Sequence, residues 1–291
     1  MKEAVSVLSD TICQLGEGPT YDPMSNRLFW FDIMGRRLLE KAWPDGETIV
    51  HELPEMASAL AVIDETRQLM LTETGLYLRD AQTGALTRHI EVEAGNAGTR
   101  SNDARVHPSG AFWISTMSKT GEKHAGSIYW YRRGELRRLY PDISIPNSIC
   151  FSPDGAVAHF ADTGKNIMFR VQCDPETGLP SGEPQVFLDH RGIEGGLDGS
   201  VVDADGVLWN ARWGSSALDA YDSDGKRLRR IALPARQTSC PAFAGPKADQ
   251  MVVTSAWTGM DDAARAADPE AGKLFLVDLP VNGRHEPRVA L

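Results

Sequence analysis

The sequence has little cysteine: four residues in 291, with no C-x-x-C pair and no dense cysteine framework. This scarcity excludes a disulfide scaffold. The chain also has no apolar run approaching the roughly 20 residues that span a bilayer, and no basic segment leading into an apolar one after Met1. We therefore expect a reduced, cytoplasmic protein.

Positive charge is also scarce. The net charge is −10, and neither sign of charge forms a long run. Nucleic acids and anionic membranes both require basic patches on their partners, so we expect neither as a partner. The rest of the composition, with 42% hydrophobic residues, 27 Gly and 17 Pro, is that of an ordinary globular protein.

Helical periodicity is nearly absent, and only residues 258–272 could form a helical turn. Instead, a polar turn followed by a short apolar run recurs along the chain, as in "YDPMSNRLFWFDI" (21–33) and "FSPDGAVAHFADT" (151–163). This pattern is typical of β-hairpins. Six equivalent turn positions are separated by 42, 43, 45, 51 and 42 residues; they are Asp22, Asp64, His107, Ser152, Asp203 and Gly245.

Each unit has a second half of the same style, for example "WPDGETIVHELP" (43–54). Four strands in about 45 residues are typical of one blade of a β-propeller. We therefore predict an all-β fold, a six-bladed β-propeller with four-stranded antiparallel blades, forming a single domain over residues 1–291. The segment 3–10 is expected to pair with 273–280 and close the ring. The alternative is a β-sandwich in which the spacing is a coincidence.

In a propeller the innermost strand of each blade lines a central channel, and here that strand should precede the repeated turn. Four of the six residues that lie five positions before the turns carry a polar side chain with an oxygen atom. The six positions are Glu17, Ala59, Asn102, Asn147, Asp198 and Cys240. If these side chains point to the axis, the polar ones converge, and Cys240 is either a fifth axial group or a small buried thiol.

Two carboxylates confined in one channel repel each other and lose their hydration. A divalent cation would resolve both problems, and oxygen ligands without thiolates favour a hard ion. Ca²⁺ is our first candidate, ahead of Mg²⁺ and Mn²⁺. The simpler alternative is that each polar residue caps a turn or is satisfied by backbone N–H groups.

Four segments together are similar to the senescence-marker-protein, gluconolactonase and luciferin-regenerating-enzyme family. The resemblance extends from about residue 10 to residue 280. It implies a six-bladed propeller with one divalent metal in the central channel, and hydrolysis of a small sugar lactone. Members of this family work with different ions, so Zn²⁺ and Fe²⁺ join the candidates. The segments are "LGEGPTYDPMSNRLFWFDI" (15–33), "RSNDARVHPSGAFWISTM" (100–117), "IPNSICFSPDGAVAHFADT" (145–163) and "GGLDGSVVDADGVLWNARWG" (195–214).

The resemblance assigns roles to five positions of this sequence. The metal ligands of the family match Glu17, Asn147 and Asp198, and its substrate-contacting R-x-N pattern matches Arg100 and Asn102. Water would be the nucleophile, and Asp198 is our candidate for the catalytic residue that orients it and takes its proton.

One position departs from the family pattern. Many members have a sugar-contacting glutamate shortly after a "GTM" segment, whereas "STMSKTGEK" offers Thr120 at that place and Glu122 two residues later. We retain Glu122 as a candidate substrate-binding residue. Residues 118–125 and 258–272 are loop-like and are candidate lids over the channel mouth.

Other functions remain open on the sequence. G-x-S-x-G and Walker-type loops are absent, so neither a serine hydrolase nor a nucleotide enzyme is supported. A hydrolase of phosphotriesters or other esters on the same scaffold is an alternative, as is a non-catalytic binding propeller with a structural cation. We expect a monomer, because a propeller buries its sheets without a partner.

Overall fold

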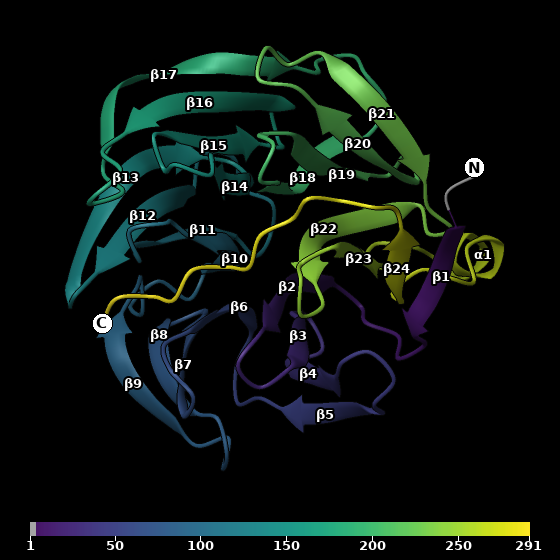
Figure 1. The fold of residues 1–291 in the computed structure, drawn as a ribbon, viewed down its shortest axis with the longest axis horizontal. Helices are drawn as coiled ribbons and strands as arrows, with labels where there is room; N and C mark the ends of the chain where they lie inside the picture. Colours follow the sequence, from purple (N-terminus) through teal and green to yellow (C-terminus); the bar gives the residue numbers. More distant parts are fainter. Residues whose placement is uncertain (1–3) are drawn as a thin grey trace.

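The computed structural model describes residues 4–291, which form sheets of short antiparallel strands arranged radially around a central channel (Figure 1). Each of the first four blades is a separate four-stranded sheet. The strands of these blades, from the channel outward, are β2 (Gly16–Asp22), β3 (Arg27–Asp32), β4 (Arg37–Ala42) and β5 (Thr48–Glu52); β6 (Ala57–Val62), β7 (Arg67–Thr72), β8 (Gly75–Asp80) and β9 (Leu86–Glu91); β10 (Thr99–Val106), β11 (Phe112–Ser118), β12 (Gly126–Arg132) and β13 (Glu135–Ile143); and β14 (Pro146–Phe151), β15 (Val157–Asp162), β16 (Ile167–Cys173) and β17 (Pro180–Asp189).

The last two blades are joined by one residue pair, Trp213 with Gln237. Blade 5 contains β18 (Gly196–Val202), β19 (Leu208–Trp213), β20 (Ala217–Tyr221) and β21 (Arg227–Ala232); blade 6 contains β22 (Gln237–Ala244), β23 (Gln250–Ala256), β24 (Leu274–Asp278) and β1 (Ala4–Ser9). Over residues 4–291 the predicted six four-stranded blades are therefore confirmed.

The ring closes through the two ends of the repeat. Strand β1 pairs antiparallel with β24, with Val5 opposite Val277, and so supplies the outermost strand of the last blade. This confirms the predicted pairing; the first residue of the predicted segment, residue 3, lies outside the described residues. The pairing ties the two ends of the described chain into one blade, and a ring of blades leaves only short, protected sheet edges.

Apolar side chains fill the space between neighbouring blades. Trp113 of blade 3 packs edge-on against Phe151 of blade 4, with ring centroids 5.4 Å apart. The Trp113 indole N–H donates to the carbonyl oxygen of Gly178 at 2.9 Å, which satisfies its one polar group. Burial of such side chains supplies most of the stability that fixes the blades around the channel.

A β-bulge interrupts the pairing of the innermost strand with its neighbour in every blade that the structure describes. A bulge adds a residue to one strand and redirects the side chains there. The bulges lie at or beside the positions predicted to face the axis: between Glu17 and Thr20, Ala57 and Ala59, Ser101 and Ala104, Asn147 and Cys150, Leu197 and Ser200, and Thr238 and Pro241.

Serine hydroxyls at these bulges join one blade to the next. Ser58 donates to the carbonyl oxygen of Asn102 at 2.6 Å. Ser148 donates to the carbonyl oxygen of Asp198, and Ser239 to that of Gly16. The inner strands are thus tied together at the level where the polar side chains gather.

The one helix in the described chain, α1 (Asp262–Ala267), lies between β23 and β24, where a helical turn was predicted. Asp261 caps it by accepting the Ala264 N–H at 2.8 Å. No helix within residues 4–291 combines the length and apolar character required to cross a membrane.

His159 makes the stability of the fold sensitive to acid. It is buried in the groove between blades 4 and 5, with its ring 4.8 Å from that of Phe187. Burial, and to a smaller extent Arg170, lowers its pKa to about 4, whereas an unfolded histidine has a pKa of about 6.5. Between these values the unfolded chain binds a proton that the folded protein does not, so stability falls as the pH falls.

We expect His159→Phe to make the pH dependence of the unfolding free energy shallower by about one proton, or up to ~3 kcal/mol, between pH 6.5 and 4. Urea unfolding of both proteins over a series of pH values measures this difference. Parallel profiles would contradict the lowered pKa.

Candidate functional site

Glu17 lies in the bulge of β2, and its side chain is 8% exposed. The following residue, Gly18, has φ +54°, and a Cβ there would lie 2.1 Å from the carbonyl oxygen of Ser58. The approach of blade 2 leaves no room for a side chain at this position, and the positive φ also favours glycine. The Glu17 carboxylate in "GEGP" therefore lies next to the boundary between blades 1 and 2.

Asp198 occupies the corresponding place on β18. A Cβ at the following residue, Gly199, would lie 2.5 Å from the sulfur of Cys240 on β22. Cys240 itself is fully buried, and its pKa is raised by burial. It is therefore a packed thiol at the boundary of blades 5 and 6, and the absence of a side chain at Gly199 lets the two inner strands meet.

Asn102 and Asn147 are joined by hydrogen bonds from β10 to β14. The Asn102 amide donates to Oδ1 of Asn147 at 2.9 Å and to the carbonyl oxygen of Pro146 at 2.9 Å. The Asn147 amide nitrogen donates to the Thr163 hydroxyl at 2.9 Å. These contacts fix the orientation of both amides, with the Asn147 nitrogen bound to Thr163 and its oxygen turned toward Asn102.

Arg100 extends this chain of contacts. Its Nη1 donates to Oδ1 of Asn102 at 2.8 Å and to the carbonyl oxygen of Ser101 at 2.8 Å. Arg100 is buried, and burial lowers its pKa to about 10 despite the nearby carboxylates of Glu17 and Asp198. Arg100 therefore does not belong to an ion pair exposed on the protein surface.

The two predicted carboxylates, Glu17 and Asp198, are buried within each other's electrostatic reach. Burial, followed by repulsion from Asp103, raises the pKa of Glu17 to about 8. Burial, followed by repulsion from Glu17 and Asp103, raises the pKa of Asp198 well above its usual range. Among the hydrogen bonds of the described chain, the Glu17 carboxylate accepts only the N–H of Gly18. In the absence of a cation the pair therefore favours bound protons, because few protein donors compensate two negative charges there.

Asp103 is a third carboxylate in the channel, and the sequence pattern did not single it out. It lies within the bulge of β10 and accepts the N–H groups of Ala104 at 2.9 Å and Ile149 at 2.8 Å. Burial raises its pKa to about 6, against the opposing effect of Arg105. Strict alternation would turn Asp103 away from the axis if Asn102 faces it. A signal was present, since two arginines and an aspartate are unusual in the buried strand "RSNDARV".

The donor set fits a hard cation. Glu17 and Asp198 supply carboxylate oxygens and Asn147 supplies an amide oxygen, the ligands that Ca²⁺ and similar ions prefer. No cluster of three or more His, Cys, Asp or Glu side chains suited to a metal occurs in residues 4–291. The channel therefore lacks an all-acidic or His-containing cage within that range, and a site with these three ligands would leave coordination positions for water or substrate.

Glu122 was predicted to contact the substrate, but no hydrogen bond or ion pair of the described residues holds it at the channel. Glu122 is exposed in the loop between β11 and β12, and its role stays a prediction. Thr120 contacts its neighbour Ser118. At the start of this loop, however, Lys119 forms an ion pair with Glu73, whose other oxygen accepts the Met56 N–H at 3.0 Å.

The Lys119–Glu73 pair lies close to the substrate-contacting residues predicted from the sequence. Glu73 acts electrostatically on Arg100, raising its proton affinity. The ammonium and carboxylate are each partly exposed, with side-chain exposures of 29% and 12%. Blades 2 and 3 therefore present one anionic and two cationic groups near the start of β10.

The second candidate lid, residues 258–272, is held next to the ring of blades by several contacts. Arg265 lies over the ring of Trp257 at 4.0 Å, and the backbone N–H groups of Trp257 and Thr258 donate to the carbonyl oxygen of Gln14. A cavity of about 610 Å³ separates this segment from the end of blade 5 and is lined in part by Trp213 and Arg236. Lid function stays a prediction for both segments.

The fold and the site together define a β-propeller with buried carboxylate and amide side chains on its inner strands. The match to known families is specific: residues 15–257 match the model of the SMP-30/Gluconolactonase/LRE-like region. The chain therefore belongs to this family, as the resemblance in the sequence predicted.

Relatives of known name cover nearly the whole chain. A "Putative sugar lactone lactonase" of Rhizobium meliloti (strain 1021) is 51% identical over 98% of this chain and 96% of its own length. The L-arabinolactonase of Azospirillum brasilense is 35% identical over 98% of this chain and 95% of its own. The crystal structure of a calcium-binding protein, regucalcin, from Agrobacterium tumefaciens is 50% identical, covers 100% of this chain and 99% of its own, and superimposes with a TM-score of 0.98.

We expect Gly199→Ala to destabilise the protein by about 1–3 kcal/mol, because the added methyl group overlaps Cys240. Gly95→Ala is the matched control, since a Cβ at Gly95 has no neighbour within 4 Å. Urea unfolding midpoints measure both effects. Equal midpoints for the two variants would contradict the close approach of β18 and β22.

Proposed function

We propose that this protein is a hydrolase that opens a sugar lactone to the aldonic acid. The observations that support the proposal are two buried carboxylates, Glu17 and Asp198, that act electrostatically on each other and on Arg100. Arg100 is in turn hydrogen-bonded to Asn102, and Asn102 to the amide oxygen of Asn147. Relatives that are 51% and 35% identical are named as sugar lactone and L-arabinose lactone hydrolases, which supports the same substrate class here.

Glu17, Asn147 and Asp198 would hold one divalent cation. When bound, it would polarise the lactone carbonyl and stabilise the negative charge that develops on its oxygen. The name of the agrobacterial structure, a calcium-binding protein, supports Ca²⁺ as the first candidate. Hard oxygen sites accept several divalent ions, so Mg²⁺, Mn²⁺, Zn²⁺ and Fe²⁺ remain candidates.

The side chains of this protein would divide the remaining work. Arg100 presents a fixed fork of donors to the sugar hydroxyls or the ring oxygen. Asn102, held between Arg100 and Asn147, both donates and accepts, which suits a polyhydroxylated ligand. Asp198 orients the attacking water and takes its proton; the water oxygen bonds to the carbonyl carbon, the ring C–O bond breaks, and the proton passes to the ring oxygen.

Lys119 and Glu73 extend the binding surface toward the channel mouth. Thr120 stands at the position of the family's sugar-contacting glutamate, with Glu122 two residues later, and Glu73 would supply a further carboxylate from the neighbouring blade. Its ion pair with Lys119 orders both side chains. We propose that this pair hydrogen-bonds the hydroxyl groups at the end of the sugar remote from the carbonyl.

We expect chelator-treated protein to be inactive, and to release acid from at least one γ- or δ-aldonolactone when Ca²⁺, Mg²⁺, Mn²⁺, Zn²⁺ or Fe²⁺ is restored. Asp198→Asn and Glu17→Gln should each lower turnover at least ~100-fold, since even outer partners of a metal site cost roughly 10–100-fold. Glu135→Gln, at an exposed ion pair with Arg137, is the control. A cation-loaded protein that hydrolyses no lactone would refute the proposal.

Lys119→Met and Glu73→Gln should each raise KM for that lactone about five- to tenfold, because a hydrogen bond to a partly exposed charged group contributes about 1 kcal/mol. The value of kcat should change by less than about twofold, because neither side chain is near the reacting carbonyl in this proposal. Steady-state kinetics at saturating cation measure the split. A loss confined to kcat would contradict a binding role for the pair.

A further inference from the structure

The C-terminal strap, residues 279–291, runs across the ring of blades (Figure 1) where the inner strands β6, β14 and β18 end, opposite the start of β10. Starting beyond β24, it contacts all six blades. The contacts are the His285 ring stacked on Tyr21 (5.6 Å between centroids), Val289 N–H to Val62 O (2.9 Å), Ala290 N–H to Gly110 O (2.8 Å), Arg284 to Phe151 O, Ala204 N–H to Asn282 O (2.7 Å), and His285 Nε2 to Gly245 O (2.9 Å).

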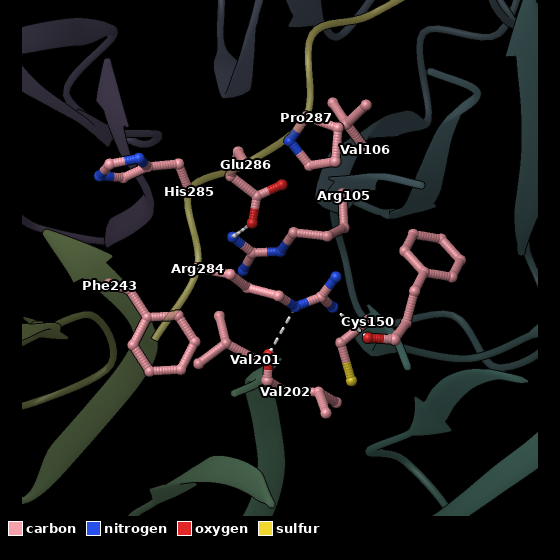
Figure 2. A pocket seen from close by; sticks show the side chains of 11 residues that line it. Arg105, Val106, Cys150, Val201, Val202, Phe243, Arg284, His285, Glu286 and Pro287 are labelled. Atoms are coloured by element: carbon pink, nitrogen blue, oxygen red, sulfur yellow. Dashed lines mark hydrogen bonds and ion pairs between the residues drawn. The ribbon is translucent and has the colours of Figure 1, made fainter. Parts of the chain in front are cut away.

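Two side chains of the strap enter the channel (Figure 2). Arg284 donates to the carbonyl oxygens of Phe151 and Val202, at the ends of β14 and β18. Glu286 points to Arg105, and the Arg105 Nη1 to Glu286 Oε1 distance is 3.1 Å. The space that remains among these groups measures only about 20 Å³. The strap therefore leaves little room at this end of the channel.

Arg105 connects the strap to the carboxylates. It lies on β10, two residues beyond Asp103 and five beyond Arg100, and its side chain is 7% exposed. Burial alone would lower its pKa, but the attraction of Glu286 and Asp103 raises it above the ordinary value, so it stays a cation. Its Nη2 donates to the carbonyl oxygen of Ser200 at 3.3 Å, which directs it across to blade 5.

Two carboxylates consequently attract Arg105. Glu286 contacts it from the strap, and Asp103, which also acts on Glu17 and Asp198, attracts it from β10. A buried guanidinium without a second carboxylate would be drawn toward the nearest remaining one, Asp103. Its positive charge would then oppose a cation held by Glu17 and Asp198.

We propose that Glu286 is a positioning residue for the cation site: it holds the Arg105 guanidinium away from the carboxylates and so preserves their affinity for a divalent ion. This inference rests on the proposed function for the cation site, but not on the identity of the lactone. Glu286 acts through Arg105 and touches neither substrate nor the ligand set.

The full-length protein carrying Glu286→Gln tests the proposal. After chelator treatment, calorimetric titration with Ca²⁺ alone, and then with Mn²⁺ alone, should give roughly tenfold weaker binding, the lower end of the range for outer partners of metal sites. Glu91→Gln, which removes a carboxylate from the exposed pair with Arg88, should bind as the wild type does.

A double-mutant cycle identifies the route of the effect. In an Arg105→Gln background, adding Glu286→Gln should change ion affinity by less than about twofold, because the group that it positions is gone. The same tenfold loss in both backgrounds would overturn the role of Arg105. Glu286→Asp keeps the charge and should retain most of the affinity, which covers the case in which Glu286→Gln folds poorly.

The remaining outcomes separate this inference from the proposed function. If Glu286→Gln lowers the unfolding temperature equally with and without Ca²⁺ and leaves ion affinity unchanged, the strap is a structural closure only and the inference fails. A wild-type protein that binds neither ion would also overturn it. A wild-type protein that binds an ion but hydrolyses no lactone would overturn the lactonase function and leave the positioning role intact.

Discussion

Electrostatic repulsion between buried carboxylates is the constraint on which the rest of the channel depends. Glu17 and Asp198 come from blades 1 and 5, and burial, followed by repulsion from neighbouring carboxylates, raises the pKa of each. Such a pair costs free energy unless a cation or a proton compensates it. A fold that nonetheless brings the two together must hold them rigidly, and the ring of interlocked inner strands does so.

The rigidity has local causes. Bulges interrupt the inner strands at corresponding positions of the six blades, and glycines allow neighbouring strands to approach where a Cβ would collide. Serine hydroxyls then bind the backbone of the next blade, as Ser148 binds the carbonyl oxygen of Asp198. Stability and the geometry of the site are consequently properties of the same contacts, so substitutions at the bulges should affect both.

The repeat made the fold predictable, because hairpins of similar length with turns every 42–51 residues have few other ways to bury their faces. It also brought out Glu17, Asn102, Asn147 and Asp198 as axial positions, although their roles remain proposals. Asp103 was missed because the repeat offset selects one residue per blade, here Asn102, and does not predict the bulge that contains Asp103. Arg105 and Glu286 were missed because their pairing joins positions 181 residues apart, and no periodic pattern predicts a contact of that kind. Glu73 was missed because the family pattern directs attention to residues after Met117 on another blade.

The strap gives the channel an asymmetry that the blades alone do not produce. Six similar blades would leave two open ends, and water entering from both would screen the charges inside. Arg284 and Glu286 place charged side chains at the far end, whereas Arg100, Lys119 and Glu73 lie toward the start of β10. A buried charge behind the carboxylates acts on them with less screening than a charge in water does. The charged side chains of the C-terminal strap therefore contribute to the electrostatics of the site as well as to the packing of the fold.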